Sequence, residues 1–154
     1  MRRFLLRMRR DIKPGGRPAC PWVVPYDPDL HRQVIPRLFA AAFGRNPWPP
    51  NWEEFDEFDP SGVFVARDPV SGTAVGFLVS FPRAGHGYVS VVAVVPEYRR
   101  RGLASALMER ACDRFHSLGM TEARVDAWED SPPAVATYRT LGFEVYDRRL
   151  EEDG

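Results

Sequence analysis

The sequence has very little cysteine and no long apolar run. Its 154 residues include only two cysteines, Cys20 and Cys112. Two cysteines are too few for a disulfide framework, and their spacing is not that of a metal site. We therefore expect a reduced, cytoplasmic protein without a bound metal. No stretch approaches the roughly 20 apolar residues that cross a bilayer. Arg7 interrupts the short apolar part of the N-terminus, so we expect neither a membrane span nor a secretory leader.

The chain also has no net charge. Lysine plus arginine and aspartate plus glutamate both number 21. A domain that binds nucleic acid is usually clearly basic, so we expect no nucleic-acid partner. The balance hides two local charge fields, because residues 1–20 are rich in arginine and Glu53–Asp59 is strongly acidic.

Proline and glycine gather in residues 13–21, KPGGRPACP, which have the composition of a linker. We therefore predict a basic arm and linker over residues 1–21 and a single domain over residues 22–154, a length that can bury a core. Helical periodicity predicts a helix over residues 27–43. Pro36 lies within it, so we expect this helix to bend there or to start late. The predicted helices cover residues 27–43, 51–58, 102–118 and 131–141. The predicted strands cover residues 22–26, 63–67, 73–81, 88–95, 122–128 and 143–149.

One strand-to-helix turn, within PEYRRRGLASAL, is suited to an anion. A strand ends at Pro96, three arginines follow at 99–101, and a helix begins near Gly102. The first turn of a helix presents free N–H groups and the positive end of the helix dipole, both of which favour phosphate oxygens. Gly102 and the small Ala104 allow close approach to the backbone. The spacing is neither that of a P-loop nor G-x-G-x-x-G. These residues alone leave open a pyrophosphate site or a solvated arginine run.

The same stretch resembles the acyl-coenzyme A motif of the GNAT N-acetyltransferases, Gln/Arg-x-x-Gly-x-Gly/Ala. Its three defining places are filled by Arg99, Gly102 and Ala104. A second family signature, Asn, Ala, Tyr and then Gly-Phe, resembles SPPAVATYRTLGF, in which Ser131 takes the asparagine place. The other matching residues are Ala134, Tyr138, Gly142 and Phe143. Two motifs in the family's order make the resemblance specific over about residues 22–146.

The resemblance implies a GNAT fold of the α/β class (α+β type). In this fold a mixed central sheet carries helices on both faces, in the order β-α-α-β-β-β-α-β-α-β. Strands 88–95 and 122–128 would run parallel and splay apart. The family usually has one more strand than this chain supplies after Tyr146. Either the sheet lacks that last strand, or residues 2–8 fill the gap, from the same chain or from a partner.

The resemblance also implies an enzyme that moves the acetyl group of acetyl-CoA to a primary amine, on a small molecule or a protein, by direct attack in a ternary complex. Tyr138 would be the acid that protonates the leaving thiolate, because a phenol is neutral at pH 7. A bulge near Val94 would turn an N–H toward the thioester carbonyl. The coenzyme would contact Val92, Ala93, Val94, Arg99, Arg100, Arg101, Gly102, Leu103, Ala104, Ser105 and Ser131.

Several features stay open at this level. The general base is Glu129, Asp130, His86 or water. The acidic, aromatic residues 46–59 would suit a cationic acceptor, although an amphipathic helix with a wet acidic face explains them more simply. A homodimer is one further expectation. The alternative function is a coenzyme A-binding regulatory or interaction module that has lost catalysis.

Overall fold

The computed structural model describes residues 2–13, 20–44 and 59–152. The strands are β1 (Arg2–Asp11), β2 (Val23–Pro25), β3 (Val63–Arg67), β4 (Ala74–Arg83), β5 (His86–Val94), β6 (Glu122–Trp128) and β7 (Glu144–Glu152). The α-helices are α1 (Pro28–His31), α2 (Ile35–Phe43), α4 (Leu103–Ser117) and α5 (Pro132–Thr140). Short 3-10 turns occupy Arg32–Val34, Pro60–Gly62 and Pro96–Tyr98. The helix predicted over residues 51–58 lies outside the described residues.

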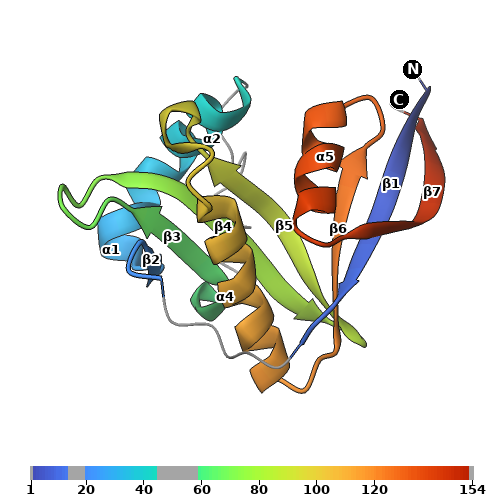
Figure 1. Ribbon diagram of the computed structural model, residues 1–154, viewed down its shortest axis with the longest axis horizontal. Helices are drawn as coiled ribbons and strands as arrows, with labels where there is room; N and C mark the ends of the chain where they lie inside the picture. The colour runs from blue at the N-terminus through green and yellow to red at the C-terminus, as the bar shows by residue number, and fades with distance from the viewer. Residues whose placement is uncertain (1, 14–19, 45–58, 153–154) are drawn as a thin grey trace.

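All seven strands form one mixed sheet in the order β2-β3-β4-β5-β6-β1-β7 (Figure 1). Helices α4 and α5 pack in one apolar cluster on one face, and α2 packs in a second cluster on the other face. The stripe predicted for the long helix is confirmed, because Leu103, Leu107, Ala111 and Phe115 are all buried. Burying one such leucine or phenylalanine contributes roughly 1.5–3 kcal/mol. The α/β class with helices on both faces is therefore confirmed.

The helix predicted over residues 27–43 is divided at its proline. Asp27 caps α1, since its Oδ1 accepts a hydrogen bond from the N–H of Asp29 at 3.0 Å. A 3-10 turn then leads into α2, which restarts at Ile35 and has Pro36 in its first turn. A proline at that position removes no intrahelical hydrogen bond. The late start predicted from Pro36 is therefore confirmed.

Strand β1 lies between β6 and β7 and is antiparallel to both. Leu5, for example, lies opposite Trp128 on one side and Arg149 on the other. Its side chains alternate, with Leu6 and Met8 buried in the cluster beneath α4 and α5. Of the two explanations for the short C-terminal part, the structure shows the second. The N-terminal segment of the same chain completes the sheet, so the segment predicted as an arm supplies a strand.

Strands β5 and β6 are parallel, and they pair over only three positions. The pairs are Gly87 with Ala123, Tyr88 with Arg124, and Val89 with Val125. On its other side β5 stays paired with β4 as far as Gly76 opposite Val94. Figure 1 shows β5 and β6 diverging toward the end of the sheet where α4 and α5 begin. The predicted parallel pair and its splay are confirmed.

Candidate active site

The turn before α4 has the backbone that its sequence predicts. Gly102 is the N-cap of α4 and has a φ of 77°, in the left-handed region that glycine occupies without strain. No atom lies within 4 Å of the place to which a side chain of residue 102 would project. No side chain caps the first turn of α4. The N–H groups of this first turn are therefore left without a bond from the N-cap side chain and suit a phosphate group.

The three arginines of this turn have different surroundings. The Nε of Arg99 donates to the carbonyl of Val94 at 3.1 Å, and its Nη2 donates to the carbonyl of Ala42 at 2.7 Å. Arg99 therefore ties the end of β5 to the end of α2. Arg101 stacks over Tyr98 at 4.6 Å. Arg100 is exposed and has a φ of 64°. As ligands of a pyrophosphate all three stay predictions.

Beyond Val89, no described strand pairs with β5 on the side of β6. Apart from the Val94 carbonyl, to which Arg99 donates, the backbone groups of Val92, Ala93 and Val94 that point to that side have no described strand as a partner and can pair with an extended ligand. The bulge lies elsewhere than predicted. The register with β4 shifts between Val79 and Ser80, so that Ser90 is the extra residue. The prediction of a bulge near Val94 is wrong in position, because the distortion falls where β5 loses β6 as its neighbour.

Tyr138 projects from α5 and packs edge-on against Phe143, with 6.1 Å between ring centroids. Burial, assisted by the charge of Asp126, raises the pKa of Tyr138 to about 12. Its hydroxyl is therefore protonated at neutral pH and can donate a proton. Among the described residues no hydrogen bond holds this hydroxyl, and the Ser131 side chain makes no capping bond to α5. Both side chains keep their polar groups available, and both roles stay predictions.

Two of the proposed bases are engaged by arginine. Arg148 donates to both carboxylate oxygens of Glu129, at 2.6 and 2.9 Å, and this lowers the pKa of Glu129. Arg3 donates to both oxygens of Asp130, at 2.9 and 2.8 Å. The pair with Arg148 makes Glu129 a weaker base, and the pair with Arg3 occupies both oxygens of Asp130.

His86 stands at the first residue of β5, in the half of the strand that stays paired with β6 rather than at the splay. Its pKa is lowered, mainly by burial and also by the nearby Arg124 and Arg83. The structure therefore places His86 away from the opening between the strands and pairs Glu129 and Asp130 with arginine.

The structure brings together two residues that the sequence reasoning did not pair. The Tyr88 hydroxyl donates to Oδ2 of Asp126 at 2.9 Å. Burial, followed by the charge of Asp126, raises the pKa of Tyr88. A signal for Asp126 existed in EARVDAW, where buried Ala123, Val125 and Ala127 alternate with polar positions. The alternation indicates a polar face, but the partner on β5 requires the register.

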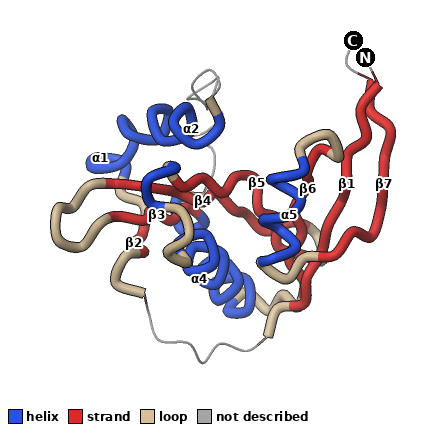
Figure 2. The backbone as a smooth tube through the Cα atoms, turned by 45° about the horizontal axis from the view of Figure 1, so that its top comes forward, coloured by secondary structure: helices blue, strands red, loops and turns tan. Residues whose placement is uncertain are grey.

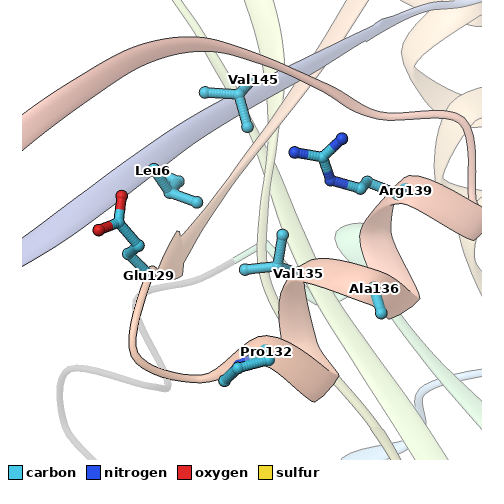
Figure 3. A pocket seen from close by; sticks show the side chains of 7 residues that line it. All are labelled: Leu6, Glu129, Pro132, Val135, Ala136, Arg139 and Val145. Atoms are coloured by element: carbon cyan, nitrogen blue, oxygen red, sulfur yellow. The ribbon is translucent and has the colours of Figure 1, made fainter.

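A separate open cavity of about 520 Å³ lies between α5 and the strands β1 and β7 (Figure 3). Val135 of α5 lies opposite Leu6 and Val145 there. The remaining lining residues are Glu129, Pro132, Ala136 and Arg139. The lining includes neither the turn before α4 nor Tyr88, Asp126 or Tyr138. The cavity is therefore distinct from the opening between β5 and β6.

Comparison with known proteins agrees with this geometry. The profile described as the Acetyltransferase (GNAT) family matches residues 32–143. The chain belongs to this family. The match spans both motifs, the divergent strand pair and Tyr138, so the GNAT assignment rests on the elements that form the site.

Mycothiol acetyltransferase of Mycolicibacterium vanbaalenii is 34% identical over 162 residues, covering 93% of this chain and 53% of the relative. The enzyme of the same name from Mycolicibacterium smegmatis is 34% identical over 159 residues, covering 94% and 54%. The chain spans about half the length of these relatives. Residues 58–66, 75–77 and 134–143 resemble parts of a single domain of mycothiol synthase. The matches to these relatives agree with that resemblance.

The crystal structure of a GCN5-related N-acetyltransferase from Sphaerobacter thermophilus superposes with a TM-score of 0.78. Its sequence is 26% identical, and the alignment covers 96% of this chain and 50% of that chain. The likeness therefore includes nearly the whole GNAT fold seen here, including β1.

Proposed function

We propose that this protein transfers the acetyl group of acetyl-CoA to a primary amine by direct attack within a ternary complex. The observation that carries the proposal is the opened edge of β5, which faces β6 over only three paired positions. The open first turn of α4 and the protonated Tyr138 accompany that edge. Membership in the GNAT family supports the reaction class.

In this proposal the pantetheine arm lies along β5 and bonds to the backbone of Val92–Val94 in the manner of an added strand. The N–H groups of the turn at residues 99–105 hold the pyrophosphate. Ser131 offers its hydroxyl to a pantetheine amide. Arg99 shapes the turn through its bonds to Val94 and Ala42, and the exposed Arg100 adds charge at the rim.

The chemistry follows from charge and protonation. The neutral amine nitrogen forms a bond to the thioester carbonyl carbon, and the carbon–sulfur bond breaks. Tyr138 donates its proton to the departing sulfur and regains one from solvent. The nitrogen loses one N–H proton to solvent, and the products are the amide and the free thiol. Starting from the ammonium form of the acceptor, one further proton is released to solvent.

The experiment is thiol release from acetyl-CoA across a panel of primary amines, with coenzyme A binding measured separately. We expect amine-dependent thiol release and a matching N-acetylated product. The second candidate is a module that binds coenzyme A without catalysis. Tyr138 keeps its proton and an unengaged hydroxyl, which favours the enzyme. Coenzyme A binding without thiol release above the amine-free rate would favour the module.

The proposal also covers the type of acceptor, the oligomeric state and the cellular location of the protein. A cationic acceptor is favoured by the acidic residues 46–59, of which only Asp59 lies within the described residues. A homodimer is supported by β7, an edge strand on which Val145, Tyr146 and Leu150 are exposed, and light scattering would test it. A cytoplasmic location is proposed from the cysteine content. Among the described helices, none has the length and apolar character needed to cross a membrane.

A further inference from the structure

Asp126 stands at the point where β5 and β6 part. It is the first residue of β6 after Val125, the last residue that pairs with β5. Val125 and Ala127 are buried in the cluster under α4 and α5. The side chain of Asp126 therefore lies on the opposite face of the sheet, because side chains alternate along a strand.

The Asp126 carboxylate is held but keeps capacity for a further bond. Oδ2 accepts the 2.9 Å hydrogen bond from Tyr88. Oδ1 has Arg7 Nε at 3.8 Å, which is an ion-pair distance and beyond a hydrogen bond. Arg7 is also 4.0 Å from Asp147 and stacks over Tyr146. Arg7 therefore interacts with several groups at once. Within the described part of the chain, Oδ1 accepts no hydrogen bond.

The same carboxylate acts on the tyrosines of both faces. Its charge contributes to the raised pKa of Tyr88, which is on β5, and of Tyr138, which is on α5. A single negative charge therefore lies near the acid proposed for the leaving thiolate and near the open end of the strand pair. The side chain of Asp126 is 24% exposed, so a ligand can reach it while much of the surrounding water is excluded.

We propose that Asp126, oriented by Tyr88, is the residue that binds the ammonium group of the acceptor. This inference rests on the proposed acetyl transfer and adds the residue that selects the acceptor. A carboxylate oxygen with an unused lone pair accepts an N–H donor strongly when the donor is charged. The ammonium donates to Oδ1, which accepts no hydrogen bond from the described residues.

The chemistry balances with Asp126 as a binding residue. The bound ammonium loses one proton to solvent water, and the resulting amine attacks the thioester carbonyl carbon. The amide nitrogen loses its second proton to solvent, and Tyr138 supplies the proton of the thiol before being reprotonated by solvent. Asp126 ends the cycle as it began, a carboxylate bonded to Tyr88. No oxidant, reductant or metal is needed.

The test compares Asp126→Asn with Glu122→Gln. Both changes remove one carboxylate from the same face of β6, but Glu122 lies at the closed end, where Arg9 and Arg124 bind it. With butylamine and phenethylamine as acceptors, we expect Asp126→Asn to lower kcat/KM for the amine roughly tenfold to a hundredfold, mainly through KM. The KM for acetyl-CoA should change less than about twofold. Glu122→Gln should leave both within about twofold.

Two further variants separate orientation from charge. Tyr88→Phe keeps the charge and removes the hydrogen bond, so its loss in kcat/KM should be smaller than that of Asp126→Asn. Asp126→Glu restores the charge and should recover part of the amine affinity. Unchanged amine kinetics in Asp126→Asn would overturn the inference. So would a loss confined to kcat, because that result assigns Asp126 to proton transfer instead of binding.

A binding measurement separates this inference from the proposed function. Butylammonium is titrated into the coenzyme A complex and followed by NMR chemical shifts, which need no turnover. If the wild type releases no thiol but binds butylammonium in a manner lost in Asp126→Asn and kept in Glu122→Gln, the transfer reaction fails and the amine site stands. If the wild type does not bind butylammonium, the inference is wrong whatever the activity.

Discussion

The two wings of the sheet differ in how they are covered. In the wing formed by β3, β4 and β5, residues 63–66 and 75–80 are all buried between α4 on one face and α2 on the other. In the wing formed by β6, β1 and β7, α5 covers one face, and β7 has no buried residue. The other face of this wing, over which no described helix packs, carries arginine–carboxylate pairs that include Arg7, Arg9 and Arg124.

The difference shows which wing contributes more to the stability of the sheet and which wing carries charged side chains on its surface. Exposed or half-exposed ion pairs contribute about 0–1 kcal/mol each, whereas buried aliphatic and aromatic side chains contribute several times more. The apolar wing therefore fixes the position of β5. The polar wing carries a surface of charged side chains next to the opening between β5 and β6. Figure 2 shows that the long strands β1 and β7 of the polar wing run side by side to the two chain termini.

The largest expected effect lies in the apolar wing. Phe77 on β4 is fully buried, so Phe77→Ala should lower the free energy of unfolding by about 3–5 kcal/mol. Leu150→Ala on β7 removes a side chain that is 42% exposed and should cost less than about 1 kcal/mol. Urea denaturation followed by circular dichroism measures both. Equal losses would mean that the two wings contribute alike to stability.

In the turn between β5 and α4, Gly102→Val should abolish measurable coenzyme A binding. Valine is strained at a φ of 77° and fills the open space in front of the first turn of α4. Arg100→Ala is the matched change, and we expect it to weaken binding only a few-fold. Isothermal titration calorimetry with coenzyme A separates the two variants. Retained affinity in a folded Gly102→Val would remove the pyrophosphate from this turn.

Tyr138→Phe tests the chemistry at the junction of the wings. We expect kcat to fall well over tenfold, because the departing thiolate loses its proton donor, while coenzyme A binding persists. The ring and its contact with Phe143 remain, so the stability should change little. Single-turnover thiol release gives the rate. An unchanged kcat would remove Tyr138 from the mechanism.

The polar wing should respond to acid through Glu122. The hydrogen bond from Arg9, together with that from Arg124, lowers the pKa of Glu122 in the folded protein. A lowered folded pKa gives stability that is present above the unfolded pKa, about 4.3 for glutamate, and is lost as the pH falls through the folded value. Glu122→Gln should therefore flatten the decrease in stability below about pH 4. Parallel pH profiles for the two proteins would contradict this.

The smallest effect is expected at the rim of the polar wing. Arg2 and Glu152 form an ion pair at 3.6 Å, with side chains that are 76% and 70% exposed. Glu152→Gln should change the free energy of unfolding by less than about 0.5 kcal/mol. Thermal melting at low and high salt would detect a larger contribution. Such a contribution would show that the outer ion pairs act as a network.

Much of the fold could be predicted because its signals are local. The apolar stripe of α4, the buried run of β5 and the proline that divides α1 from α2 are each contained in one segment. The family motifs likewise occupy two short stretches of sequence. The place of β1 could be stated only as an alternative, since it depends on partners more than 100 residues away: Leu5 lies opposite Trp128.

The candidate site was less accessible to sequence reasoning for the same reason. Gly102 and Tyr138 carry family motifs, so their positions were predicted. The contact between Tyr88 and Asp126 depends on the parallel register of β5 and β6, which no local pattern encodes. The bulge was predicted near Val94 and lies at Ser90, because the separation of two strands, and not the sequence of one, determines where it falls.

The position of β1 has a consequence for how the chain acquires its structure. Although β1 precedes every other strand described here in sequence, its two neighbours in the sheet are β6 and β7, which come after β2 to β5. Arg2 meets Glu152 across nearly the whole chain. Such non-local pairing slows folding, since a long loop must close before the contact is gained. During synthesis the apolar wing can form early, whereas the polar wing, and with it the surroundings of Asp126, is completed only after β7 has been synthesised.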